Sequence, residues 1–189
     1  MEVRGVIVNT AKEFVRLRFG ERYSEWVNLL PLETKNIILS EVGVDKWYPI
    51  FEGMVIPTEA ICHLFYYDDY KGAWELGRFS ADISLNHIYT KLFSFTSLEF
   101  LYNNAANIMY TYYRPCNIEI GILNENNKKS IFMRLIEFSD PSKYIECRIG
   151  GWLERAFEIS GDKNVKIEIT KSMAKGDTFT EFICVHKDT

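Results

Sequence analysis

The sequence predicts an α+β fold, in which an N-terminal helical subdomain packs on a C-terminal four-stranded antiparallel sheet that carries one helix. Helix-start and helix-stop signals follow one another through residues 1–114, whereas residues 115–189 alternate apolar and polar side chains in runs of strand length. No repeat and no long linker separates the two parts. We therefore interpret residues 1–114 and 115–189 as subdomains of one compact domain.

The first helix is expected over residues 10–19. Thr10 and Glu13 have the spacing of a capping box, in which a hydroxyl and a carboxylate bind free amide groups at a helix start. Gly20 follows at a position suited to end that helix.

Prolines mark the boundaries of the next elements. Pro31 precedes a helix expected over residues 33–42, and Pro49 predicts a turn at the Trp-Tyr-Pro of residues 47–49. Three further helices are expected before Pro115, over residues 58–70, 73–93 and 97–113.

The pattern after Pro115 predicts the order strand, strand, helix, strand, strand. Ile118, Ile120 and Ile122 alternate with other residues, which is the period of a half-buried strand. A polar turn and a second run of β-forming residues complete a hairpin. The remaining elements are, in order, the hairpin turn at 124–129, its second strand over 131–138, a helix over 142–159, a strand through Val165, Ile167 and Ile169, a turn at 175–177 and a strand over 179–186.

Composition excludes several classes of partner. The 189 residues carry a net charge of -4, and Lys and Arg are scattered, so we expect no nucleic-acid partner. Apolar stretches are much shorter than the roughly 20 residues of a membrane span, so we expect no membrane-spanning helix.

The four cysteines are far apart and include no Cys-x-x-Cys pair: Cys62, Cys116, Cys147 and Cys184. This pattern favours reduced thiols, a cytoplasmic location and no metal site.

Candidate catalytic groups are few, and we expect no enzyme activity. There are three histidines, and Cys62 beside His63 would point to a different side of a helix, where the two side chains cannot act as nucleophile and base. We expect His63, His87 and His186 to be packed or surface residues rather than ligands.

The helix expected near residues 100–113 holds the best candidate site. It changes from large rings to small and amide-bearing side chains, in a chain that is 15% aromatic. Such a face allows close helix packing, or it leaves a void walled by rings in which buried Asn amides bind a polar group of a ligand. Under the second interpretation the candidate ligand-binding residues are Leu101, Asn104, Ala105, Ile108, Phe138, Trp74 and Phe79.

Residues 75–101, ELGRFSADISLNHIYTKLFSFTSLEFL, together with this order of elements, resemble the heme-nitric oxide/oxygen-binding (H-NOX) family. The segments RGVIVNTAKEFVRLRFG, LLPLE, WYP and ELGRFSA are similar to a bacterial family related to it, whose activity is not established. The resemblance covers nearly the whole chain and implies an H-NOX-like fold. In the heme-binding proteins it also implies a histidine ligand to iron on the long helix and a Tyr-x-Ser-x-Arg motif that binds the propionates.

This chain departs from both heme motifs. Counted from Glu75, the position of the iron ligand falls on Ile108, whose hydrocarbon side chain cannot coordinate iron. The three motif positions fall on Phe138, Asp140 and Ser142. The resemblance therefore implies an H-NOX-like protein without heme, and we expect no cofactor.

Residues 150–185 also resemble 4-vinyl reductase-type domains and, more distantly, subunits of vesicle-tethering transport particles. Zinc-carrying members would have cysteines around the final hairpin, where this chain has Ser172 and Thr180. Cys147 would then lack its thiolate partners, so we expect no zinc.

Two functions remain open from the sequence. The first is a heme-free ligand-binding or sensory module that holds a small hydrophobic molecule between the helical and sheet subdomains. The alternative is a protein-interaction scaffold, or a homodimeric signalling module, whose cavity is filled by side chains.

Overall fold

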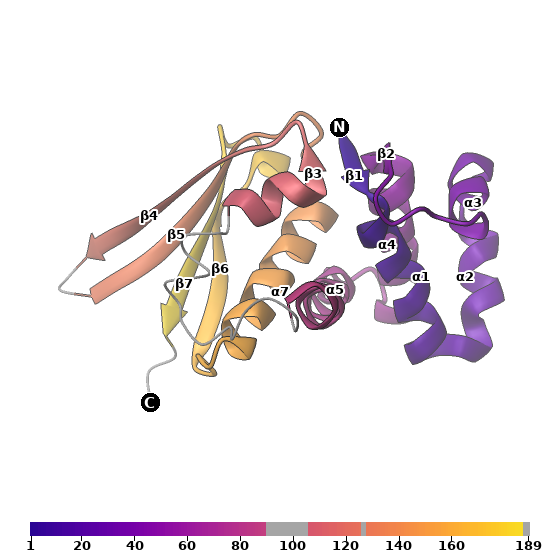
Figure 1. The fold of residues 1–189 in the computed structure, drawn as a ribbon, viewed down its shortest axis with the longest axis horizontal. Helices are drawn as coiled ribbons and strands as arrows, with labels where there is room; N and C mark the ends of the chain where they lie inside the picture. The colour runs from indigo at the N-terminus through magenta and orange to yellow at the C-terminus, as the bar shows by residue number, and fades with distance from the viewer. Residues whose placement is uncertain (90–105, 126–127, 187–189) are drawn as a thin grey trace.

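A computed structural model describes residues 1–89, 106–125 and 128–186 of the chain. Its elements form successive layers (Figure 1): a twisted antiparallel sheet, helix α7 against one face of it, helix α5 against α7, and the other N-terminal helices beyond α5. One cluster of buried side chains runs through these layers, from Val3 and Ile61 to Leu135 and Phe182. The division at residues 114 and 115 therefore stays an interpretation of the sequence, since the core is continuous across it.

Helix α1 spans Gly5–Phe19 and begins five residues earlier than predicted. Thr10 lies inside it, and its hydroxyl donates a hydrogen bond to the carbonyl of Ile7 (2.7 Å). The capping-box prediction is therefore wrong. The predicted end at Gly20 is confirmed, because α1 stops at Phe19 and a 3-10 turn, Gly20–Arg22, follows.

The helices predicted over residues 33–42 and 58–70 are present with shifted ends. Helix α3 is shorter than expected, and α4 stops at Tyr66 because Tyr67 and Asp68 have left-handed backbones (φ 54° and 64°). Residues 106–112 are helical, and the rest of the helix predicted over 97–113 lies outside the described residues. The bounds are α2 Tyr23–Leu29, α3 Leu32–Leu39, a π-helical turn Phe51–Val55, α4 Ile56–Tyr66 and α5 Lys71–Tyr89.

A small antiparallel sheet was not predicted. Strand β1, Glu2–Arg4, pairs with β2, Trp47–Pro49, on one side and with β3, Tyr113–Arg114, on the other. The turn predicted at residues 47–49 is therefore wrong. Strands of two or three residues are too short to show a two-residue period, and Pro49 is acceptable because β2 is an edge strand.

The predicted four-stranded sheet is confirmed. Its strands pair antiparallel in the order β4-β5-β7-β6, and α7, Lys143–Ile159, crosses one face. Gly161 and Gly176 follow α7 and the last 3-10 turn with positive φ (104° and 97°), a conformation that favours glycine. The strands are β4 Asn117–Glu125, β5 Lys128–Glu137, β6 Val165–Lys171 and β7 Thr180–His186.

Helices α5 and α7 meet backbone to backbone. A Cβ atom added to Gly77 would lie 2.1 Å from the carbonyl oxygen of Arg148, and one added to Gly151 would lie 2.1 Å from the carbonyl oxygen of Trp74. Only glycine fits at either position, so these two residues fix the distance between the helices.

Partly buried ion pairs also hold the same two helices together. Arg78 of α5 binds Glu154 and Glu158 of α7 (2.7 and 2.8 Å), and Arg155 of α7 binds Asp82 of α5 (2.7 Å). Burial opposes ionisation of Glu158, but the hydrogen bonds from the two arginines outweigh it and lower the pKa of that carboxyl.

Among the described residues, no helix has the length and apolar character needed to cross a bilayer.

The Gly151 contact predicts a large effect of one methyl group. Gly151→Ala should destabilise the protein by about 3 kcal/mol or more in urea unfolding, because α5 and α7 must move apart to admit the Cβ atom. Gly20→Ala is the matched control, since nothing lies within 4 Å of its Cβ position and its backbone is helical. We expect the control to change stability by less than about 1 kcal/mol; equal effects of the two substitutions would contradict the close approach.

Candidate functional site

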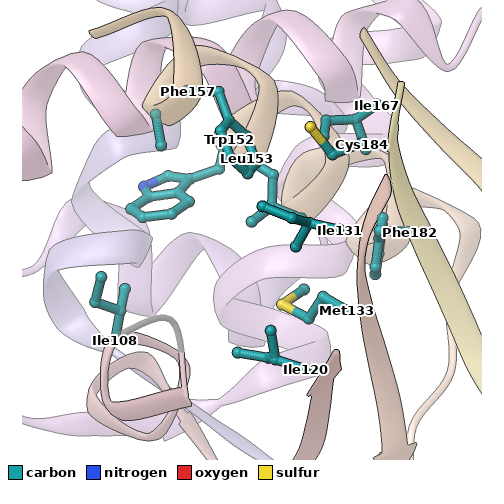
Figure 2. Close-up of a pocket in the computed structure, with 11 residues that line it drawn as sticks. Ile108, Ile120, Ile131, Met133, Trp152, Leu153, Phe157, Ile167, Phe182 and Cys184 are labelled. Atoms are coloured by element: carbon teal, nitrogen blue, oxygen red, sulfur yellow. The ribbon is translucent and has the colours of Figure 1, made fainter. Parts of the chain in front are cut away.

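An apolar cavity of about 40 Å³ lies between α7, the sheet and the helical residues 106–112. Figure 2 shows side chains from all three sides arranged around it. Its walls are hydrocarbon, aromatic or sulfur-containing: Ile108, Ile120, Ile131, Met133, Trp152, Leu153, Ala156, Phe157, Ile167, Phe182 and Cys184.

The periods of helix and strand explain why these residues converge. Trp152, Leu153, Ala156 and Phe157 have the spacing of one face of α7. Strand residues two apart, such as Ile131 and Met133 of β5 or Phe182 and Cys184 of β7, point to the same face of the sheet. The cavity is thus the remaining space between a helix face and a sheet face that otherwise pack closely.

Trp152 forms part of the wall toward α1 and α5. Its indole N–H donates a hydrogen bond to the hydroxyl of Ser84 on α5 (3.0 Å), which orients the ring. In Figure 2 the ring lies on the same side of the cavity as Ile108, across from Ile131 and Phe182 of the sheet. Trp152 and Ile108 also line a second cavity of about 20 Å³, on the side of α1 and α5.

Arg148 lines this second cavity and is buried (2% exposed). Its guanidinium donates hydrogen bonds to the hydroxyls of Thr58 (3.1 Å) and Thr10 (3.0 Å) and to the carbonyl of Ile7 (3.3 Å). These contacts tie α7 to α1 and α4. Burial lowers the pKa of Arg148 to about 10, so the side chain is still charged at neutral pH.

Thiols near the site are protonated at neutral pH. Burial raises the pKa of Cys184, in the cavity wall, to about 12, and it raises the pKa of Cys62 to about 12 and that of Cys147 to about 11. A protonated buried thiol is a poor nucleophile and behaves as a small apolar group.

A larger cleft of about 380 Å³ lies farther from the sheet, beside α1 and the end of the helical residues 106–112. Arg4 lines it, but its guanidinium is occupied by the carbonyls of Thr111 and Asp45 and lies over the Trp47 ring (4.4 Å). Its other lining residues include both charged and apolar side chains, so its chemistry is less specific than that of the two interior cavities.

The structure brings one of the predicted site residues to the cavity. Ile108 lines both interior cavities. Trp74 instead packs against Gly150 and donates to Glu154 (3.2 Å) at the α5–α7 contact, and Phe79 packs edge-on against Phe14.

Phe138 is buried against the Tyr113 ring (5.8 Å between centroids), where no space remains. Leu101, Asn104 and Ala105 lie outside the described residues.

Sequence reasoning missed most of the cavity wall, above all Trp152 and Met133. A signal was present in the Gly150-Gly151-Trp152 triplet, because two adjacent glycines inside a helix indicate close packing against another backbone. The bulky residue that follows them is then held at the same interface.

The residues at the positions of the heme motifs do not suit heme. Ile108 offers no ligand atom, and the free space beside it is a few atoms in size rather than that of a porphyrin. At the motif positions, Phe138 is packed in the core and Asp140 pairs with the N-terminal ammonium of Met1. His63 is exposed and pairs with Asp68 (2.8 Å), while the side chain of His87 lies outside the described part of the chain.

The positions compared with zinc ligands carry a different network. The hydroxyls of Ser172 and Thr180 each donate to the buried carboxylate of Glu146 (2.6 Å), which also pairs with Lys143. This network joins α7 to the last hairpin. Within the described residues, no group of three or more His, Cys, Asp or Glu side chains could hold a metal ion.

Comparisons with known proteins identify the fold. No protein-family model and no curated protein matches the chain. Solved structures match with TM-scores of 0.65–0.66 and cover 98% of this chain and 97–99% of their own: an H-NOX protein from S. oneidensis in the Fe(II)NO state (17% identity), the H-NOX domain of Shewanella oneidensis in the Fe(II)CO state (17%) and an unliganded Fe(II) H-NOX protein from K. algicida (14%). The H-NOX-like fold expected from the sequence is therefore confirmed.

Truncation of Ile108 tests its place between the two cavities. Ile108→Ala should destabilise the protein by about 2–5 kcal/mol, because it removes buried methyl groups and enlarges the free space. Ile122→Ala, on an exposed position of β4, should cost less than about 1 kcal/mol. Urea unfolding measures both, and a small effect at position 108 would contradict its burial in the core.

Proposed function

We propose that this chain is a heme-free ligand-binding module with the H-NOX fold, and that it holds a small apolar molecule between α7, the sheet and the helical residues 106–112. The observation that supports this proposal most is the apolar cavity that Ile108 lines. It occupies the junction between the helical and sheet parts. In this arrangement packing, rather than coordination to iron, would hold the ligand.

The size of the cavity limits the ligand. A volume of about 40 Å³ exceeds the roughly 10–15 Å³ that one water needs, and it is well below the roughly 150 Å³ of an engineered cavity that binds benzene. The free space therefore suits a molecule of a few heavy atoms. A slightly larger ligand needs movement of Met133, whose unbranched side chain adapts more readily than the other walls.

The walls of the cavity support a sensory role. Ile108 and Trp152 connect the cavity to α1 and α5 through the second cavity and the Ser84 hydrogen bond, whereas Met133 and Phe182 belong to the sheet. A ligand that prefers one arrangement of these walls would shift the balance between conformations of the two parts.

The chemistry of the described residues supports binding without catalysis. The thiol in the cavity wall is protonated, and His63 is exposed near the end of α4. Covalent catalysis needs a nucleophile, a base and a group that orients the base. Among the described residues, no such set lines the cavity.

The small volume also favours a second candidate function. Trp152, Phe157 and Phe182 fill much of the junction, which suits a protein-interaction scaffold or a homodimeric signalling module with a closed core. The two candidates differ in whether an apolar probe enters the junction.

Xenon tests the first candidate because it enters dry apolar cavities. We expect xenon to shift the methyl NMR signals of Ile108, Met133 and Leu153 in a saturable way. Cys184→Ile should abolish these shifts by filling the cavity from β7. Cys116→Ile, a half-buried cysteine outside the cavity wall, is the matched control and should leave them unchanged.

Two results would decide against ligand binding at the junction. Unchanged methyl signals in the unmodified protein would favour the scaffold. Equal xenon shifts in Cys184→Ile and in the control would mean that xenon binds elsewhere.

A further inference from the structure

Arg148 is a buried cation without a described counterion. It extends from α7 to α1 and α4, where its three hydrogen-bond acceptors are two hydroxyls and one carbonyl, all neutral. A guanidinium carries five N–H donors, so these contacts use three of them. Among the described residues, no carboxylate forms an ion pair with Arg148.

The neighbouring ionisable groups do not neutralise this charge. Those that act on Arg148 are Tyr113 and Cys62. Burial raises the pKa of both, to about 12 for Cys62 and above its ordinary value for Tyr113, so both are uncharged at neutral pH. A buried charge without a partner of opposite sign is costly, and a bound anion would relieve that cost.

Space for an anion lies beside Arg148. Arg148 and Tyr113 line the cavity of about 20 Å³, and the remaining walls include Ile7, Met109 and Ile149. Ile108 and Trp152 line both this cavity and the apolar cavity of about 40 Å³. The junction thus combines one positive charge at one end with a small hydrocarbon-lined space at the other.

We propose that the ligand of this junction is a short-chain carboxylate, whose carboxylate group pairs with Arg148 and whose alkyl group lies against Ile108 and Trp152. This proposal rests on the ligand-binding function proposed above and names the class of ligand. Nη2 of Arg148 donates to Ile7 and Thr10, and Nη1 donates to Thr58, so one N–H on Nε and one on Nη1 remain. Either can donate a charge-assisted hydrogen bond to a carboxylate oxygen. The Tyr113 phenol, which is uncharged, lines the same cavity and can donate a further one.

The single positive charge and the small volume of the junction argue against doubly charged anions and against long-chain carboxylates. A phosphate or sulfate carries roughly two negative charges, and a single arginine neutralises only one of them. The other charge would stay buried in apolar surroundings, which is costly. The combined free volume, far below that of a benzene-sized cavity, limits the alkyl chain to a few carbons.

A calorimetric titration of the full chain with formate, acetate, propionate, butyrate and hexanoate tests the proposal at constant ionic strength. We expect saturable binding that is tightest for acetate or propionate and lost for hexanoate. The neutral amides acetamide and propionamide match the shape without the charge, and they should bind about ten- to a hundredfold more weakly. This comparison needs no variant and so holds even if changes at Arg148 prevent folding.

Variants then locate the binding. Arg148→Met should abolish carboxylate binding. Arg148→Lys should weaken it, because a lysine keeps the charge but has three N–H donors, too few to bind Ile7, Thr10, Thr58 and a carboxylate together. Arg134→Met is the matched control, since Arg134 lies on the sheet and pairs with Glu119 and Glu181. It should leave the affinity unchanged.

Three results would overturn the proposal: amides that bind as tightly as carboxylates, chloride or nitrate that binds as tightly as acetate, or carboxylate affinity that Arg148→Met retains. If carboxylates fail to bind while xenon still shifts the methyl signals of the cavity, this inference fails and the proposed function stands. If xenon also fails, the proposed function fails with it.

Discussion

The close contact between α5 and α7 is the constraint on which the rest of the structure depends. Gly77 and Gly151 let the two backbones touch, and ion pairs from Arg78 and Arg155 flank that contact. Because α7 also covers the sheet, this single crossing positions the sheet relative to the N-terminal helices (Figure 1). It also directs side chains of α7 into the space between the two parts. The interior of the junction is therefore set by a backbone distance rather than by any one side chain.

Two residues of α7, four positions apart, give this interior its character. Trp152 supplies volume and is oriented by Ser84, whereas Arg148 supplies a positive charge and reaches α1 and α4. Residues four apart share a helix face, so both point toward the helical part. Their neighbours on the adjacent face, such as Leu153, meet the sheet and enclose the apolar cavity. These features support the proposal that the junction binds a small ligand with one charged end.

The sequence predicted the larger elements well because their periods extend over many residues. The two hairpins, α7 and the sheet follow directly from the alternation after Pro115 and the helical pattern before Gly161. The predicted start of α1 was wrong because Thr10 has the sequence pattern of a helix cap but lies inside the helix. There its hydroxyl accepts a buried hydrogen bond from Arg148.

The candidate site was harder to predict, since Ile108 was expected from a family position but its partners come from distant strands and from α7. Their convergence depends on sheet register and on the α5–α7 distance, which no local pattern encodes. A buried arginine that binds neutral oxygens likewise resembles an exposed one in the sequence. We propose that the side chains around Ile108 narrow the junction to a small cavity that cannot hold heme. Titration of the purified protein with hemin, followed by absorption spectroscopy, tests this claim most directly. We expect no stoichiometric complex, whereas a one-to-one complex with the Soret band of histidine-ligated heme would contradict it.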